Sequence, residues 1–320
     1  MIDISDEFFA SASNLLNPRA PISKPGTFVA TGAWYDGWET RRHNEAGYDY
    51  VIVRLGTAAG WIRGIEVDTA FFNGNHAPLV SVEAVFDTDA DADADQRVKQ
   101  MARVEEGWTT LLAKTGTGPS ARHAWWVEEK FHQQAFTHVR LRMYPDGGIA
   151  RFKVYGIAQP VWPNNPSLEI ELSAAQMGGI AVACSDQHYG GIDNILLPGR
   201  GVDMGDGWET KRSRGPNHVD WVVVKLGAVG CVQRVVVDTM HFRGNFPQAV
   251  RVDGCSIDEG KVWSDADWTP LVTDRKMKAD EEAECDLVDG AKGRKCSHVR
   301  LTIIPDGGVK RLRVFGVRAA

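Results

Sequence analysis

The same ordered set of short motifs occurs twice along the chain, and this internal repeat restricts the fold more than any other feature of the sequence. Position 37 corresponds to position 207 and position 146 to position 306, so the offset falls from 170 to 160 residues between the first and last motifs. Such self-similarity indicates that one structural unit has been duplicated. The paired segments are Asp36–Arg42 with Asp206–Arg212, Asp49–Gly56 with Asp220–Gly227, Val67–Asn75 with Val237–Asn245, His138–Leu141 with His298–Leu301, Pro145–Gly148 with Pro305–Gly308, and Arg151–Gly156 with Arg311–Gly316.

The falling offset means that the first copy contains extra residues, and a proline-rich stretch separates the two copies. We place the extra residues in Asp87–Gln96, where Asp and Ala alternate, and interpret this segment as a solvated surface loop. It lacks the glycine-centred pattern of a calcium-binding loop. Pro160, Pro163 and Pro166 are incompatible with a helix or a central strand and stiffen the chain. The sequence therefore predicts a first repeat at 1–158, a linker at 159–168 and a second repeat at 169–320.

Short apolar runs rich in β-branched residues, bounded by turn residues, predict that each repeat is built from strands. A Pro-Asp-Gly-Gly turn follows one of them, and we interpret it as a hairpin because proline fixes φ and glycine accepts positive φ. Helices are expected only near Asp6–Leu16 and Ala94–Glu106. The predicted fold class is all-β, with two tandem sandwiches of antiparallel sheets. The expected strands are Tyr50–Leu55, Ile62–Asp68, His138–Tyr144 and Arg151–Tyr155 in the first copy, and Trp221–Leu226 and Val232–Asp238 in the second.

Composition and charge exclude several classes of protein. Hydrophobic residues make up 43% of the chain and charged residues 24%, which is enough apolar material for a core in each repeat. The net charge is −6 and no basic stripe is present, so nucleic acid is not an expected partner. No apolar run approaches the roughly 20 residues of a membrane helix, and the acidic start is unlike a secretory signal, so we expect a cytoplasmic protein without a membrane partner. Five cysteines, all in the second half and without Cys-x-x-Cys, favour reduced thiols.

The strongest functional signal is the Gly-Trp-Glu-Thr segment, which two basic residues follow in each repeat. It places an aromatic ring, a carboxylate, a hydroxyl and two cations in a loop before a strand, where proteins commonly hold ligand groups. Arginine suits a substrate carboxylate because its planar fork gives paired, charge-assisted hydrogen bonds. The structural alternative is that the tryptophans close the end of the sandwich and the glutamates pair with arginines. The residues are Trp38, Glu39, Arg41 and Arg42, and Trp208, Glu209, Lys211 and Arg212.

Two further repeated residues are candidates for the site. Asn75 and Asn245 end a Phe-x-Gly-Asn segment, where the amide could hydrogen-bond a ureido ligand or simply occupy a left-handed turn. His138 and His298 begin strands, and an imidazole there could transfer protons or be a satisfied, half-buried residue.

Four repeated aspartates and the absence of several known motifs also bear on the function. Asp146 and Asp306 suit turns first and acid–base chemistry second, whereas Asp68 and Asp238 need an arginine or a ligand if they are buried. The sequence lacks the serine-hydrolase, zinc-protease, phosphate-loop and dinucleotide motifs. It predicts no cofactor and no metal ligands, and it leaves open a divalent metal assembled from distant residues.

Together, the paired motifs resemble the allantoicase family. The resemblance rests on Asp-Gly-Trp-Glu-Thr-Arg-Arg, Val-Ile-Val-Arg-Leu-Gly, Val-Asp-Thr with Phe-Asn-Gly-Asn, and Pro-Asp-Gly-Gly, and it extends from about Asn14 to Val317. More distantly, the repeats look like galactose-binding jelly rolls. The resemblance implies two tandem jelly-roll domains and hydrolysis of allantoate to ureidoglycolate and urea, a step in purine breakdown. The copies differ where Lys211 replaces Arg41 and Arg243 replaces Asn73, and His76 has no histidine counterpart.

The implied reaction assigns roles to the candidate residues. Allantoate has one carboxylate and two ureido groups on a single carbon, so release of urea requires a proton for the leaving nitrogen and water for that carbon. A tandem module that only binds carbohydrate or another small ligand is the alternative, and a structural subunit is a third. Which repeat works, and whether the chain forms a homo-oligomer, stay open. Our hypothesis, consistent with both the residue chemistry and the resemblance, takes these residues as candidates. Those for binding the carboxylate are Arg41, Arg42, Lys211 and Arg212, those for a ureido group are Asn75 and Asn245, those for further substrate contacts are Trp38 and Trp208, and those for acid and base are Glu39, Glu209, His138 and His298.

Overall fold

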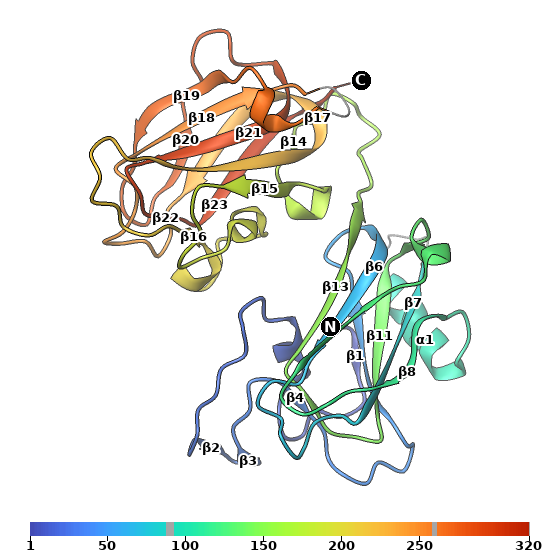
Figure 1. Ribbon diagram of the computed structural model, residues 1–320. Helices are drawn as coiled ribbons and strands as arrows, with labels where there is room; N and C mark the ends of the chain where they lie inside the picture. The colour runs from blue at the N-terminus through green and yellow to red at the C-terminus, as the bar shows by residue number, and fades with distance from the viewer. Residues whose placement is uncertain (88–92, 258–260, 320) are drawn as a thin grey trace. The chain divides into compact units, whose positions relative to one another are not determined.

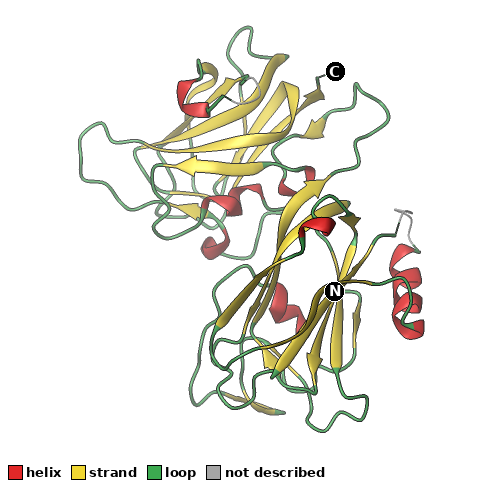
Figure 2. Ribbon diagram, turned by 45° about the vertical axis from the view of Figure 1, so that its right-hand side comes forward, coloured by secondary structure: helices red, strands yellow, loops and turns green. Residues whose placement is uncertain are grey.

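The computed structural model describes residues 1–87, 93–257 and 261–319, and strands dominate both halves of the chain (Figure 2). The chain divides into two compact units, Met1–Gln159 and Pro160–Ala320. The predicted loop at Asp87–Gln96 includes residues 88–92, which lie outside the described residues, and its last three residues begin helix α1 (Ala94–Val104). Within the described ranges, no helix is both long and apolar enough to cross a membrane.

The first unit is built from two antiparallel sheets (Figure 1), and its buried hydrophobic residues come from both of them. One sheet has the order β1-β5-β11-β7-β8, and the other has the order β10-β6-β13 with β9 also paired to β6. Two short pairs, β12–β4 and β2–β3, lie outside these sheets. The strands are β1 (Asp3–Ile4), β2 (Phe28–Val29), β3 (Gly32–Ala33), β4 (Trp38–Glu39), β5 (Asp49–Arg54), β6 (Ala59–Asp68), β7 (Leu79–Val85), β8 (Thr109–Gly116), β9 (Arg122–Trp126), β10 (Ala135–Phe136), β11 (His138–Tyr144), β12 (Gly148–Ile149) and β13 (Arg151–Gln159), with 3₁₀ helices at Ala12–Leu16 and Glu129–Phe131.

The second unit has the same architecture, except that one long strand, β17 (Asp220–Asp238), replaces β5 and β6. Its first half pairs with β15 and its second half with β20 and β23, while β21 pairs along both halves across a register shift. The two strands predicted at Trp221–Leu226 and Val232–Asp238 are therefore one. The remaining elements are β14 (Ile170–Glu171), β15 (Ile180–Cys184), β16 (Trp208–Glu209), β18 (Ala249–Cys255), β19 (Thr269–Lys276), β20 (Glu282–Cys285), β21 (Arg294–Ile304), β22 (Gly308–Val309) and β23 (Arg311–Arg318), with 3₁₀ helices at Ala175–Met177, Ile192–Leu196, Met204–Asp206 and Trp263–Asp265.

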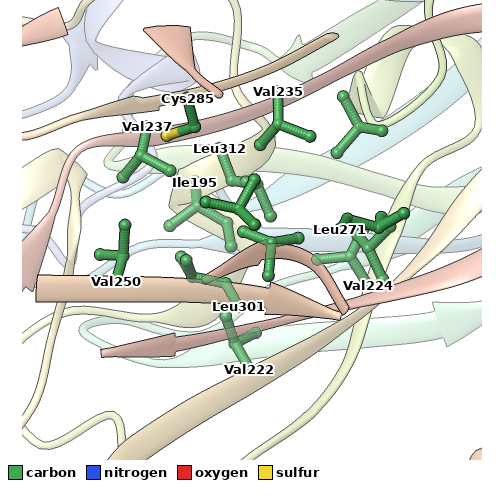
Figure 3. Packing of buried hydrophobic residues seen from close by; sticks show 14 of the residues in the cluster. Ile195, Val222, Val224, Val235, Val237, Val250, Leu271, Cys285, Leu301 and Leu312 are labelled. Carbon is green, nitrogen blue, oxygen red and sulfur yellow. The ribbon is translucent and has the colours of Figure 1, made fainter. Parts of the chain in front are cut away.

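In each unit, the hydrophobic core is formed by every second side chain along the central strands. In β11, Val139, Leu141 and Met143 all point into the core of the first unit, as their spacing of two residues predicts. In the second unit, Leu301 of β21 lies opposite Val222 of β17, and both are among the buried side chains shown in Figure 3. Burying a side chain of this size stabilises a fold by about 1.5–3 kcal/mol. The all-β prediction of two jelly-roll sandwiches is confirmed.

The predicted hairpin at Pro-Asp-Gly-Gly is wrong. Strand β11 pairs with β5 and β7, whereas β13 pairs with β6 in the other sheet, so the turn passes the chain from one sheet to the other. The glycines permit close packing at this crossing: a Cβ on Gly148 would stand 2.1 Å from the Phe72 ring, and one on Gly147 would stand 2.7 Å from the Ala77 nitrogen. The turn thereby brings Asp146 to the end of the sandwich.

Candidate active site

The Trp-Glu-Thr segment is fixed at one end of each sandwich by the turn that follows β11 or β21. In the first unit, β4 pairs with β12 so that Glu39 lies opposite Gly148. The Thr40 nitrogen also donates to the Gly147 carbonyl over 3.0 Å. In the second unit, β16 pairs with β22 and Glu209 lies opposite Gly308. This pairing places the glutamate beside the turn aspartate, more than 90 residues away in sequence.

In the first repeat, four polar side chains form one cluster. Glu39 is buried, and its Oε1 accepts hydrogen bonds from Nη2 of Arg42 and from Nδ2 of Asn75, both at 2.8 Å. Nε of Arg42 lies 3.6 Å from Oδ1 of Asp146. The other oxygen of Asp146 accepts the backbone N–H of His43 over 2.9 Å. The cluster therefore joins a carboxylate, an amide and a guanidinium, and two carboxylates balance the positive charge of the guanidinium.

The second repeat has the same residues in a more open arrangement. Nδ2 of Asn245 donates to Oε1 of Glu209 over 2.6 Å, and Oδ2 of Asp306 accepts the Ser213 N–H over 2.7 Å. Arg212 is exposed, and within the described part of the chain no ion pair or hydrogen bond engages its side chain. A cavity of about 440 Å³ takes in all four of these groups. Its lining includes Tyr189, Glu209, Arg212, Asn245, Gln248 and Asp306.

A cavity of about 530 Å³ lies beside the cluster of the first repeat. It is lined by the loop that contains Arg41, Arg42 and His43, together with Asp6 and Asp49. Glu39, Asn75 and Asp146 do not line this cavity. In the second repeat all four residues of the cluster line the cavity, whereas in the first repeat only Arg42 does.

The two tryptophans are core residues. Trp38 and Trp208 are fully buried, and their indole N–H groups donate to the carbonyls of Asp6 over 2.7 Å and Asp186 over 2.8 Å. A side chain with no exposed surface and a satisfied N–H offers nothing to a ligand. The prediction of a substrate-binding role gives way to the structural alternative that these rings close the ends of the sandwiches.

The two histidines lie far along their strands from the glutamates. His138 begins β11 as predicted, but His298 does not begin a strand, because β21 starts at Arg294. Each histidine lies eight residues before the turn aspartate, so at the usual strand rise the two residues are separated by about 20 Å. The ring of His138 contacts Thr137 and Asp95, and the ring of His298 contacts Ser297. Within one unit, the structure does not bring these imidazoles together with the glutamate.

We call Arg41 and Lys211 the outer cations of the motif, and Arg42 and Arg212 the inner arginines. An aspartate binds the backbone N–H of each outer cation. Arg41 is exposed and its side chain pairs with Asp6, which also accepts the Arg41 backbone N–H over 2.6 Å. Asp186 accepts the Lys211 backbone N–H in the same way, over 2.7 Å. These aspartates hold the loop, a role that nothing in their sequence context indicated.

A buried arginine after the glycine turn organises each loop, a role that was not predicted from the sequence. Arg311 is almost fully buried and donates to the carbonyls of Gly199, Asp206 and Lys310 over 2.7–3.1 Å. Arg151 donates to the corresponding carbonyl of Asp36 over 2.9 Å and pairs with its carboxylate. Because Asp36 and Asp206 begin the Asp-Gly-Trp-Glu segment, the arginine fixes the start of the candidate site. The repetition of this arginine was the available signal.

The buried strand-end aspartates are also satisfied by neighbours. Asp238 is paired by both Nε and Nη2 of Arg200, over 2.7 and 2.8 Å, and its Oδ1 accepts the Met240 N–H. Asp68 accepts the Ala70 N–H over 2.8 Å. An arginine, one of the two partners expected for such a residue, is the partner of Asp238. Among the described residues, no group of three or more His, Cys, Asp or Glu side chains is arranged to hold a metal ion.

Fold and site together define a class of protein: a tandem jelly roll that repeats a carboxylate, amide and guanidinium cluster at one end of each sandwich. A family model described as the allantoicase repeat matches residues 1–159 and 170–319. The chain belongs to the allantoicase family.

Individual relatives agree with this assignment. Allantoicase from Neurospora crassa is 52% identical over 100% of this chain and 88% of its own length, and allantoicase from Saccharomyces cerevisiae is 48% identical over 99% and 90%. A probable allantoicase from Pseudomonas aeruginosa is 40% identical over 99% and 92%. The crystal structure of Saccharomyces cerevisiae allantoicase superimposes with a TM-score of 0.81 at 47% identity, over 98% of this chain and 89% of that one.

Proposed function

We propose that this protein is an allantoicase that hydrolyses allantoate to ureidoglycolate and urea, and that the chemistry takes place at the repeated cluster of glutamate, asparagine, arginine and aspartate. Membership of the family supports the reaction. The observation that supports the location is the glutamate carboxylate, held by an asparagine amide beside an arginine in both repeats. The substrate is a small anion, and the open cavity of about 440 Å³ is within the usual range for small-molecule sites.

The cluster offers a partner for each part of allantoate. The arginine guanidinium suits the substrate carboxylate, because two parallel N–H groups match two carboxylate oxygens. Asn75 and Asn245 each use one N–H on the glutamate, which leaves the amide oxygen to accept an N–H of a ureido group. These contacts would fix the central carbon of the substrate next to the glutamate.

The glutamate is the group we assign to proton transfer. As a carboxylate it accepts a proton from water, the water oxygen forms the new bond to the central carbon, and the C–N bond to the departing ureido group breaks. The proton then passes from the glutamate to the departing nitrogen, so that urea leaves neutral and the other water proton stays on the new hydroxyl group. General acid–base catalysis of this kind contributes about 10²–10⁴-fold. We leave His138 and His298 out of this step because of their distance from the cluster.

Urea release from allantoate by the purified protein tests the proposal. The parent protein should produce urea, and a double variant with Glu39→Gln and Glu209→Gln should lose at least about 100-fold in kcat while staying folded. No turnover by the folded parent, with or without added divalent metal, would contradict the activity. Full turnover by the folded double variant would contradict only the role of the glutamates. Adding a chelator to the parent assay reveals whether a metal takes part.

A further inference from the structure

Among the positions at which the two copies of the site differ, two rim positions exchange an apolar side chain in the first repeat for a polar one in the second. The backbone N–H groups of Phe9 and Tyr189 donate equivalently to the carbonyls of Glu39 and Glu209, over 3.2 and 3.1 Å. Pro78 and Gln248 are equivalent as well. The Pro78 carbonyl accepts the Thr117 N–H over 2.9 Å, and the Gln248 carbonyl accepts the Met277 N–H over 3.0 Å. At these two positions the first repeat has an apolar side chain, and the second has a phenol and an amide.

The inner arginines also differ in their charge environment. Arg42 is engaged by Glu39 at 2.8 Å and faces Asp146 at 3.6 Å, so its positive charge is already shared between two carboxylates. Arg212 has no such partner among the described residues and lines the open cavity. An anion that binds Arg212 therefore meets a positive charge without an ion-pair partner among the described residues, whereas one that binds Arg42 is repelled by the two carboxylates already beside it.

The cavity of the second repeat combines all the groups that a ureide anion requires. Arg212 provides positive charge, Glu209 and Asn245 the held carboxylate, and Gln248 an amide with one acceptor and two donor hydrogens. A primary amide is complementary to a ureido group, which also presents a carbonyl oxygen beside N–H groups. Tyr189 adds a hydroxyl at the mouth, where its side chain is 63% exposed.

We propose that the second repeat contains the working active site, and that Tyr189 and Gln248 are substrate-binding residues that the first repeat lacks. The first repeat then keeps the fold of the site but holds its arginine in an internal ion pair. This inference rests on the proposed function, since it specifies which of the two clusters turns over the ureide.

Substitution of the rim residues provides the first test. Tyr189→Phe installs the side chain of the first repeat, and Gln248→Met removes the amide at similar size while keeping the backbone N–H that bonds Ile304. Each should raise the KM for allantoate about tenfold, equivalent to about 1.4 kcal/mol, with a smaller effect on kcat. The matched controls are Phe9→Tyr and Pro78→Gln, which should leave both constants within twofold. If the second-repeat variants keep the parent KM, or if the first-repeat exchanges raise turnover, the inference is wrong.

Substitution of the two inner arginines provides the second test. Arg212→Gln should lower kcat/KM at least tenfold more than Arg42→Gln does, with both proteins verified as folded by circular dichroism. Equal losses in an active parent background would overturn the inference while leaving the proposed function intact. An inactive parent would instead contradict the proposed function, so the two failures can be told apart.

Discussion

The side-chain amide of Asn245 donates a hydrogen bond to Oε1 of Glu209 over 2.6 Å. This contact fixes the carboxylate that we assign to proton transfer. Asn245→Ala should lower kcat by about 10–100-fold, because a small misplacement of a catalytic group is costly. Steady-state urea release measures the effect. Asn73→Ala, at an exposed position of the equivalent loop, is the control and should keep parent activity. A parent-like kcat for Asn245→Ala would show that Glu209 needs no such support.

Arg311 should be essential for the stability of the second unit. Arg311→Met leaves the carbonyls of Gly199, Asp206 and Lys310 without their donor, and we expect a loss of about 3–5 kcal/mol in the free energy of unfolding. Urea denaturation followed by circular dichroism measures it. The control, Arg251→Met, removes a partly exposed ion pair with Asp274 and should cost less than about 1 kcal/mol. Similar small losses for both variants would contradict this account.

The free energy of unfolding should decrease at acidic pH because His138 is buried in the folded state. Burial lowers the pKa of this imidazole, and Asp95 opposes the shift only in part. The folded state therefore favours neutral His138, so its contribution is complete above the ordinary pKa of about 6.5 and is lost as the pH falls through the lower folded value. The free energy of unfolding of the parent should decrease from pH 7 to pH 5. His138→Gln should flatten this decrease, whereas exposed His188→Gln should not; an unchanged pH profile for His138→Gln would count against the assignment.

Three of the five cysteines should resist modification in the folded protein. Burial raises the pKa of Cys255, Cys285 and Cys296 to about 11, so at pH 8 only about one thiol in a thousand is ionised at these sites. A thiol-titrating reagent should react slowly with the native protein, first at the half-buried Cys184 and Cys231. All five thiols should react in denaturant. Rapid reaction of all five in the native state would indicate that the second core opens readily.

The repeat and the strands were predictable because local patterns determine them. The alternation of Val139, Leu141 and Met143 shows which face of β11 is buried without any tertiary information. The structural alternative paired both glutamates with arginines. Glu39 and Arg42 form such a pair, whereas within the described residues Glu209 has no ion pair with an arginine. Burial of Trp38 and Trp208 was likewise only the structural alternative to the predicted substrate-binding role.

The features of the site that could not be predicted from the sequence depend on pairing between strands that are far apart in the chain. Whether His138 or Asp146 joins Glu39 depends on β4 pairing with β12, and no local pattern records that contact. The Pro-Asp-Gly-Gly turn was misread for the same reason. Its glycines fit a hairpin equally well, and only the packing of Gly148 against Phe72 distinguishes a crossing between sheets. The different environments of Arg42 and Arg212 also depend on three-dimensional neighbours.

Each hydrophobic core is closed within its own stretch of chain: the described core residues of the first unit lie between Ala12 and Phe152, and those of the second between Leu172 and Val314. The segment between them, with its three prolines, is therefore a linker at which the polypeptide could be cut or rejoined without exposing either hydrophobic core. Whole repeats could be exchanged between relatives at this linker, and the ancestral duplication would have joined two already complete domains.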